Sequence, residues 1–221
     1  MLRDKLASDT LKMPLGIIRL SYRDNVEGQF DLIENGTPTA LGKTLEVVVL
    51  PGAYSQLKKS EKTPTGLTFS FKSEYFPSSE TNKIREKYNA FDKTVYKTYT
   101  LRPVYIPSLK KVALLDLHGV NHKVWIDARP NLYDLIELGT TIKKNGASKY
   151  FELTITIKEN DYDIRHEQEL ADVEEAIIKS LEAWENYVKQ YNAKKELTEE
   201  NHTETEAVGV ASDVEDDDIP F

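Results

Sequence analysis

The sequence predicts a mainly β protein of the α+β class, followed by a helix and an acidic tail. Three observations lead to this prediction. Within the first 160 residues, about seven short segments alternate apolar and polar side chains with a period of two. The period then changes to that of an amphipathic helix, and the last residues contain almost no large apolar side chains. We therefore expect a folded domain over 1–160, a helix over 161–195 and a disordered tail over 196–221.

The expected strands occur at intervals along the first part of the chain. They cover 14–20, 29–33, 44–50, 67–71, 95–101, 112–117 and 150–157. Asn35-Gly36 predicts a hairpin turn, because both residues tolerate positive φ. One helix is expected between Asn121 and Leu138, interrupted at Pro130. This pattern fits a β-sandwich or a small barrel, including one of the oligonucleotide-binding (OB) type, and periodicity does not separate the two.

An apolar stripe marks the predicted C-terminal helix. Its residues follow steps of three and four, which places them on one side of a helix: Leu170, Val173, Ile177, Leu181, Trp184, Val188 and Tyr191. The stripe either packs against the β domain or pairs with another copy of itself, which would make the protein a homo-oligomer. The sequence does not separate these alternatives.

Charge divides the chain into a basic and an acidic part. The net charge of the whole chain is −8. Residues 1–160 contain 24 lysines and arginines against 18 aspartates and glutamates, a net charge of +6. Residues 161–221 contain 5 against 19, a net charge of −14. A basic body with an acidic arm is typical of a nucleic-acid binder whose arm competes for the basic surface.

The most basic stretch of the chain, 83–111, also carries aromatic rings. It has eight lysines and arginines against two acidic residues. Cations that follow phosphates and rings that stack on bases are what sequence-independent binding of single strands requires. We predict that these residues bind single-stranded DNA: Lys83, Arg85, Lys87, Tyr88, Phe91, Lys93, Lys97, Tyr99, Arg102 and Tyr105.

Strand periodicity distinguishes among these residues. Lys97 and Tyr99 share one face of their strand, which we expect to face DNA, and Tyr96 lies on the other, toward the core. Aromatic rings at alternating strand positions are also common in protein cores, so each of these rings can instead belong to the core. A further basic and aromatic cluster is expected in a loop, either as a rim of the interface or as a solvated loop: Tyr54, Lys58, Lys59 and Lys62.

The end of the chain combines negative charge with an apolar tip. Its last residues are Asp216, Asp217, Asp218, Ile219, Pro220 and Phe221. An aromatic residue beside a terminal carboxylate can enter an apolar pocket with a basic rim, and the aspartates would steer it there. A tail that only improved solubility would have no use for Ile-Pro-Phe. We therefore expect this tip to bind partner proteins.

The tip resembles the acidic C-terminal tip of bacterial single-stranded DNA-binding proteins, whereas the body is more similar to members that phages encode. In that family the tip docks on replication, recombination and repair enzymes, with the terminal Phe as the anchor. The resemblance implies the same role for Phe221. It also implies an OB-type barrel that binds and protects single-stranded DNA without sequence specificity.

Several classes of site are not expected. The chain has no cysteine, which excludes disulfides, cysteine zinc sites and thiol nucleophiles. Asp116, His118 and His122 do not suit a metal, because no predicted helix spans both histidines. Carboxylates between 161 and 169 fit a solvated helix start better than a nuclease centre. Without a catalytic motif, we predict no enzyme activity and neither metal nor cofactor.

The chain shows neither a signal peptide nor an apolar run of membrane-spanning length. We therefore expect a cytoplasmic protein, in the host cytoplasm if a phage encodes it, without a membrane partner. Two other functions stay open. One is a DNA-processing enzyme, a nuclease or an annealing factor, that carries the same tail. The other is a decoy that occupies partner pockets and hardly binds DNA.

Overall fold

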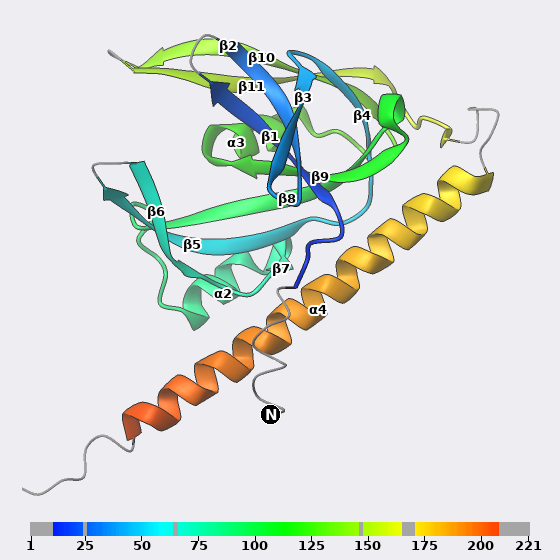
Figure 1. The fold of residues 1–221 in the computed structure, drawn as a ribbon. Coiled ribbons are helices and arrows are strands. Elements are labelled where there is room, and N and C mark those ends of the chain that lie inside the picture. The colour runs from blue at the N-terminus through cyan, green and yellow to red at the C-terminus, as the bar shows by residue number, and fades with distance from the viewer. Residues whose placement is uncertain (1–10, 24–25, 64–65, 146–147, 165–170, 208–221) are drawn as a thin grey trace, which may run out of the picture.

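The computed structural model describes residues 11–23, 26–63, 66–145, 148–164 and 171–207. In this part of the chain the protein is mainly β, as predicted, with a curled half-barrel sheet and three α-helices (Figure 1). The helices are α2 (Thr81–Lys87), α3 (Gly119–Ala128) and α4 (Ala171–Ala207). The strands are β1 (Gly16–Arg23), β2 (Val26–Glu34), β3 (Thr37–Gly42), β4 (Leu45–Val49), β5 (Tyr54–Thr63), β6 (Gly66–Lys72), β7 (Phe76–Pro77), β8 (Tyr96–Ile106), β9 (Lys111–His118), β10 (Leu135–Asn145) and β11 (Ser148–Glu159).

Strand β8 lies at the centre of the sheet and connects its parts. The main sheet has the order β11-β10-β4-β8-β9-β1-β2-β3, in which β1 and β9 run parallel. The N-terminal half of β8 also pairs with β5, from Tyr96 opposite Lys59 to Leu101 opposite Tyr54. Its C-terminal half pairs with β4 instead. The β5–β6 hairpin therefore extends the sheet beside the N-terminal half of β8.

The sheet curls until β10 comes close to β2. Thr140 Oγ1 donates a hydrogen bond to the carbonyl oxygen of Gly28, with 3.4 Å between the two oxygens. Gly28 has a φ of 24°, and a Cβ there would lie 2.7 Å from the ring of Phe151. A glycine is needed for this approach, because any side chain would collide with the ring.

The inner face of the curled sheet holds the main core. It is lined by aliphatic and aromatic side chains from strands all around the curl: Ile18, Phe30, Leu32, Val47, Val104, Leu115, Ile136 and Leu138. Helix α3 lies within the curl, where Trp125 completes this core at 2% exposure (Figure 1). The concave side of the curled sheet is therefore filled by packed side chains.

The helix expected from Asn121 to Leu138 is wrong in its second half. Helix α3 ends at Ala128, because Arg129 takes a left-handed φ of 49° and Pro130 follows it. β10 then begins at Leu135 and buries its alternate residues in the barrel. Tertiary packing against β4 and β11 thus selects a strand where the local pattern allowed a helix.

The region on either side of β4 contains one confirmed and one wrong prediction. The hairpin at Asn35-Gly36 is confirmed: it joins β2 to β3 with φ values of 50° and 81°. The prediction that Tyr54, Lys58, Lys59 and Lys62 lie in a loop is wrong, because these residues belong to strand β5. Its lysines interrupt the apolar pattern by which strands are recognised.

Helix α4 packs across the outer face of the sheet (Figure 1). Trp184 is fully buried, and Ile177 and Val188 are buried with it. The ring of Trp184 meets the rings of Tyr54 and Tyr75 edge-on, with centroids 5.6 and 5.4 Å apart. Of the two alternatives for the apolar stripe, packing against the β domain is therefore confirmed for the described residues.

Helix α4 also extends beyond its expected end. It continues to Ala207, so residues 196–207 are helical where the sequence analysis expects disorder. Glu, which is frequent there, is a strong helix former even when few apolar side chains are present. Residues 208–221 lie outside the described residues, and with them the whole tip from Asp216 to Phe221.

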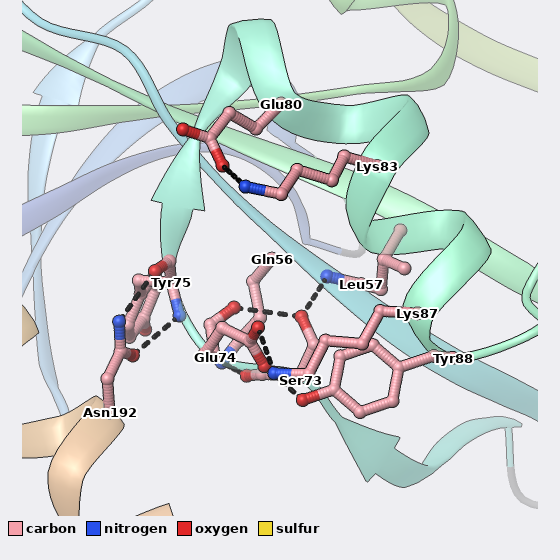
Figure 2. Close-up of polar contacts among 10 residues, drawn as sticks. All are labelled: Gln56, Leu57, Ser73, Glu74, Tyr75, Glu80, Lys83, Lys87, Tyr88 and Asn192. Carbon is pink, nitrogen blue, oxygen red and sulfur yellow. Dashed lines mark hydrogen bonds and ion pairs between the residues drawn. The ribbon is translucent and has the colours of Figure 1, made fainter.

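Polar contacts attach the C-terminal half of α4 to the loop between β6 and β7. The side-chain amide of Asn192 accepts a hydrogen bond from Tyr75 N at 2.9 Å and donates one to Tyr75 O at 2.7 Å (Figure 2). Gln56 Nε2 donates to Tyr191 Oη at 3.0 Å and to Ser73 O at 2.8 Å. These bonds fix the position of the helix along the sheet.

We predict that Trp184→Ala lowers the free energy of unfolding by about 3–5 kcal/mol, because it empties a buried site between helix and sheet. Urea denaturation followed by circular dichroism measures the change. Ile178→Ala is the control on the same helix: its side chain is 51% exposed, and it should cost less than about 1 kcal/mol. Equal effects of the two substitutions would contradict this packing.

Candidate nucleic-acid interface

The alternation of β8 distributes the predicted site residues over two faces. Lys97, Tyr99 and Tyr105 lie on the outer face, and Arg102 on the inner face. Tyr105 is buried beneath α4, where it packs against Ile177, so its ring is closed to a base. The guanidinium of Arg102 lies 5.1 Å from the ring centroid of Trp125 inside the barrel, and burial lowers its pKa.

Tyr96 also follows the expected alternation. It packs with Phe71 against the small apolar cluster beneath α2, on the face opposite to Lys97 and Tyr99. Lys97 is exposed and Tyr99 is half-buried. Of the predicted residues on β8, this pair therefore remains on the accessible part of the outer face.

Three of the predicted residues around α2 are engaged within the protein. Arg85 is buried and donates hydrogen bonds to Ala90 O at 2.6 Å and to Thr98 Oγ1 at 2.7 Å. Lys87 Nζ lies 2.8 Å from a carboxylate oxygen of Glu74, and Tyr88 donates to the other oxygen (Figure 2). Arg85 thus attaches α2 to β8, and Lys87 and Tyr88 attach it to the β6–β7 loop, so all three side chains stabilise the fold.

The other predicted residues of this stretch are exposed at the surface. Lys83 forms an ion pair with Glu80 at 3.5 Å, within one turn of α2 (Figure 2). Phe91 is 59% exposed and Lys93 is exposed beside it, both in the segment between α2 and β8. The predicted stretch thus does not form one surface.

The structure instead assembles a basic and aromatic surface from five adjacent strands, which we call the open face. It lies on the outer side of β6, β5, β8, β9 and β1, beside the part that α4 covers (Figure 1). At a strand spacing of about 4.8 Å it is about 19 Å wide. Its residues are Arg19, Lys58, Phe69, Lys72, Lys97, Tyr99 and His118.

Tyr99 is the centre of the open face. The ring of His118 stacks on it with centroids 5.0 Å apart, and Phe69 meets it edge-on at 5.5 Å. Lys58 Nζ lies over the Tyr99 ring, 4.1 Å from its centroid. Burial raises the pKa of Tyr99, as does the nearby charge of Asp116. The rings that remain accessible for stacking are therefore Phe69, at 38% exposure, and the His118 side chain, at 56%.

A buried carboxylate, Asp116, lies among these cations. Its side chain is 5% exposed, and its Oδ2 accepts a hydrogen bond from Arg19 Nε at 3.0 Å. Nδ1 of His118 is 3.9 Å from the other oxygen, which is too far for a hydrogen bond. Burial raises the pKa of Asp116, but His118, Arg19 and Lys58 outweigh it and hold the pKa below its usual value.

Burial also affects the central lysine of the open face. The pKa of Lys58 is lowered, chiefly because the side chain is partly removed from water. The charge of Asp116 opposes this effect, whereas Arg19 and Lys72 add to it. The charged form of Lys58 would therefore be stabilised by an additional negative charge, such as a phosphate.

The open face contains several residues that the sequence analysis did not select: Arg19, Phe69, Lys72, Asp116 and His118. They belong to three strands, β1, β6 and β9, and Arg19 and Asp116 are separated by 97 positions in the chain. A search for a local basic stretch cannot find such a surface. Alternation over 67–71 would place Phe69 on the same side as Phe71, but an irregularity in the pairing of β6 with β5 puts Phe71 in the cluster beneath α2 and Phe69 beside Tyr99.

Within the described ranges, His, Asp and Glu side chains do not gather in any group that could hold a metal ion. Among the described helices, none has both the length and the apolarity needed to cross a bilayer. The search for similar proteins gave no matching family model, no matching curated protein and no matching solved structure.

We predict that Glu74→Gln lowers the free energy of unfolding at neutral pH by about 1 kcal/mol, because the carboxylate holds Lys87 and Tyr88. Burial raises the pKa of Glu74, but these hydrogen bonds more than offset this and lower it overall. A lowered folded-state pKa gives stability that is present above the unfolded-state value of about 4.3 and lost as pH falls through the folded-state value.

The difference between wild type and Glu74→Gln should therefore disappear on acidification. Urea denaturation at a series of pH values from neutral to acidic measures it. Glu80→Gln, which removes only an ion pair on the surface of α2, is the matched control and should change stability little at any pH. A pH-independent loss in Glu74→Gln would show that the carboxylate charge is not involved.

Proposed function

We propose that the protein binds single-stranded DNA on the open face without general sequence specificity and protects it. The observation that carries this proposal is the placement of cations and rings on the outer side of five adjacent strands. Phosphates would contact Arg19, Lys58, Lys72 and Lys97, and bases would stack on Phe69 and His118. Binding of this kind is not enzymatic and uses neither metal nor cofactor.

We also propose that the curled sheet is an OB-type barrel. A curled sheet of short, mostly antiparallel strands supports this, as does a helix that packs into the barrel core. OB barrels bind oligonucleotides on an outer face, which is where the open face lies. The residues predicted around α2 then have a supporting role: Lys87 and Tyr88 hold the β6–β7 loop next to the interface, and Arg85 attaches α2 to β8.

We also propose that the C-terminal tail recruits partner proteins. Asp216 to Phe221 would dock on replication, recombination and repair proteins in the cytoplasm, or in the host cytoplasm if a phage encodes the chain. The 37-residue helix α4 stands between the open face and the tail, so DNA binding and recruitment would use different parts of the chain.

We predict that Phe69→Ala weakens the binding of oligo-dT about 5- to 100-fold, the effect of losing one stacked base. The measurement is quenching of Tyr and Trp fluorescence by the oligonucleotide, at low and at moderate salt. The matched control is Phe91→Ala, which removes a more exposed ring outside the open face and should leave affinity nearly unchanged. A larger effect of Phe91→Ala would place the interface in the stretch 83–111 instead.

We predict that Phe221→Ala abolishes capture of replication and repair proteins by the immobilised chain, because it removes the apolar anchor of the tip. Affinity for oligo-dT should stay unchanged, since the tip does not belong to the open face. Pull-down followed by mass spectrometry, beside the fluorescence titration, separates the two effects. Unchanged capture by Phe221→Ala would exclude the anchor role.

A further inference from the structure

A small cavity lies where α4 meets the open face. Its volume is about 250 Å³, below the roughly 300–1,000 Å³ of pockets for drug-sized ligands. Its charged lining consists of three cations, Arg19, Lys58 and Lys72, and one carboxylate, Asp116. We call it the helix pocket. Its size suits a group no larger than about one nucleotide, and its positive lining favours an anion.

The wall of the helix pocket on the α4 side is aromatic. Tyr187 and Tyr191 come from the helix, and Tyr75 comes from the loop that Asn192 holds in place. Both hydrogens of the Gln56 amide are used, by Ser73 O and by Tyr191 Oη. These hydrogen bonds hold the aromatic wall in place, and aromatic rings can pack against a planar base by stacking or edge-to-face contact.

One polar atom at the helix pocket stands out. Oδ1 of Asp116 is buried and has no hydrogen-bond partner among the residues that the structure describes. Its neighbour Oδ2 is occupied by Arg19 Nε, so the arrangement leaves one fixed acceptor. An unpaired buried acceptor is costly, and a ligand with an N–H group would remove this cost.

We propose that the helix pocket binds one nucleotide of the strand and prefers a base with an exocyclic amino group, which donates a hydrogen bond to Asp116 Oδ1. The inference rests on the proposed function, because the strand would reach the pocket along the open face. The phosphate is held by the surrounding cations, chiefly Lys58 and Arg19. Carboxylates accept hydrogen bonds from the amino group of cytosine, whereas thymine carries a carbonyl oxygen at that position.

The test compares oligo-dC with oligo-dT of about eight nucleotides, a length within the range of OB sites, at neutral pH. The two bases have the same ring size but differ in the group at C4, in the proton at N3 and in the methyl group at C5, so the ratio of the two dissociation constants is interpreted together with the Asp116 variant. The wild-type protein should bind oligo-dC about tenfold more tightly than oligo-dT. Equal affinities would overturn the inference and leave the proposed function intact.

Asp116→Asn provides a sharper test, because it should reverse the base preference and not only weaken binding. Its side-chain oxygen would keep the hydrogen bond from Arg19 Nε, which places the amide NH₂ where Oδ1 was. An acceptor is replaced by a donor, and the preference should reverse toward oligo-dT, whose base offers O4. A purely structural role of Asp116 predicts an equal loss for both oligonucleotides, and that result would overturn the inference.

Asp134→Asn is the matched control, because Asp134 is another buried aspartate. It accepts hydrogen bonds from the backbone N of Asn131 at 2.8 Å and of Asp161 at 3.3 Å, and it does not line the helix pocket. This variant should keep the wild-type ratio between oligo-dC and oligo-dT. A changed ratio would attribute the preference to stability rather than to the pocket.

Mononucleotides keep the inference testable if Asp116→Asn does not fold. Chemical shift changes in the wild-type protein on addition of dCMP and of dTMP report the pocket directly. Stronger binding of dCMP supports the inference, and equal binding overturns it. Preference for dCMP without binding of either oligonucleotide would reject the proposed function and assign the pocket to free nucleotides.

Discussion

The packing of α4 on the outer face of the sheet determines which surface of this protein is available. Trp184 is buried between the helix and the rings of Tyr54 and Tyr75, and Ile177 covers Tyr105 further along. The outer face of β8 is thereby divided into a covered C-terminal half and an accessible N-terminal half. Because the inner face is filled by the core, the accessible half is where strands from distant parts of the chain expose charge together.

Electrostatics then organises that accessible half around Asp116. Cations on neighbouring strands repel one another, and partial burial lowers the pKa of Lys58. A single buried carboxylate reduces this repulsion and fixes Arg19 at 3.0 Å. The cost of burying Asp116 is offset only in part within the protein, since one of its oxygens has no donor among the described residues. A basic surface that also carries one fixed hydrogen-bond acceptor distinguishes ligands that have a matching donor from those that lack one, which a basic surface alone does not.

The fold could largely be predicted from the sequence, because its signals are local. Period-two alternation located most strands, Asn35-Gly36 marked a hairpin, and the stripe through Trp184 predicted an amphipathic helix, whose packing on the sheet the sequence left open. The errors arose where tertiary context overrides local pattern. The start of β10, Leu135 to Leu138, lies in the segment expected to be helical, and β5 carries lysines because its outer side belongs to the open face rather than to the core.

The site could be predicted only in part, and the reason is topological. Lys97 and Tyr99 were found because they lie on one strand, and the alternation correctly placed them on one face. Arg19, Phe69 and His118 come from other strands, and only their pairing through β5, β8, β9 and β1 brings them to the same surface. Arg85 and Tyr105 show the converse error, since a basic or aromatic residue in the right stretch can serve the interior.

A base preference in one pocket is compatible with coating strands of any sequence. Stacking on Phe69 and His118 accepts every base, because every base has a π face. Three of the four DNA bases carry an exocyclic amino group. A strand of mixed sequence that shifts by about one or two nucleotides would therefore nearly always present a suitable base to Asp116. The pocket would then have little effect on which sequences are bound. It would mainly set the register in which each strand is held.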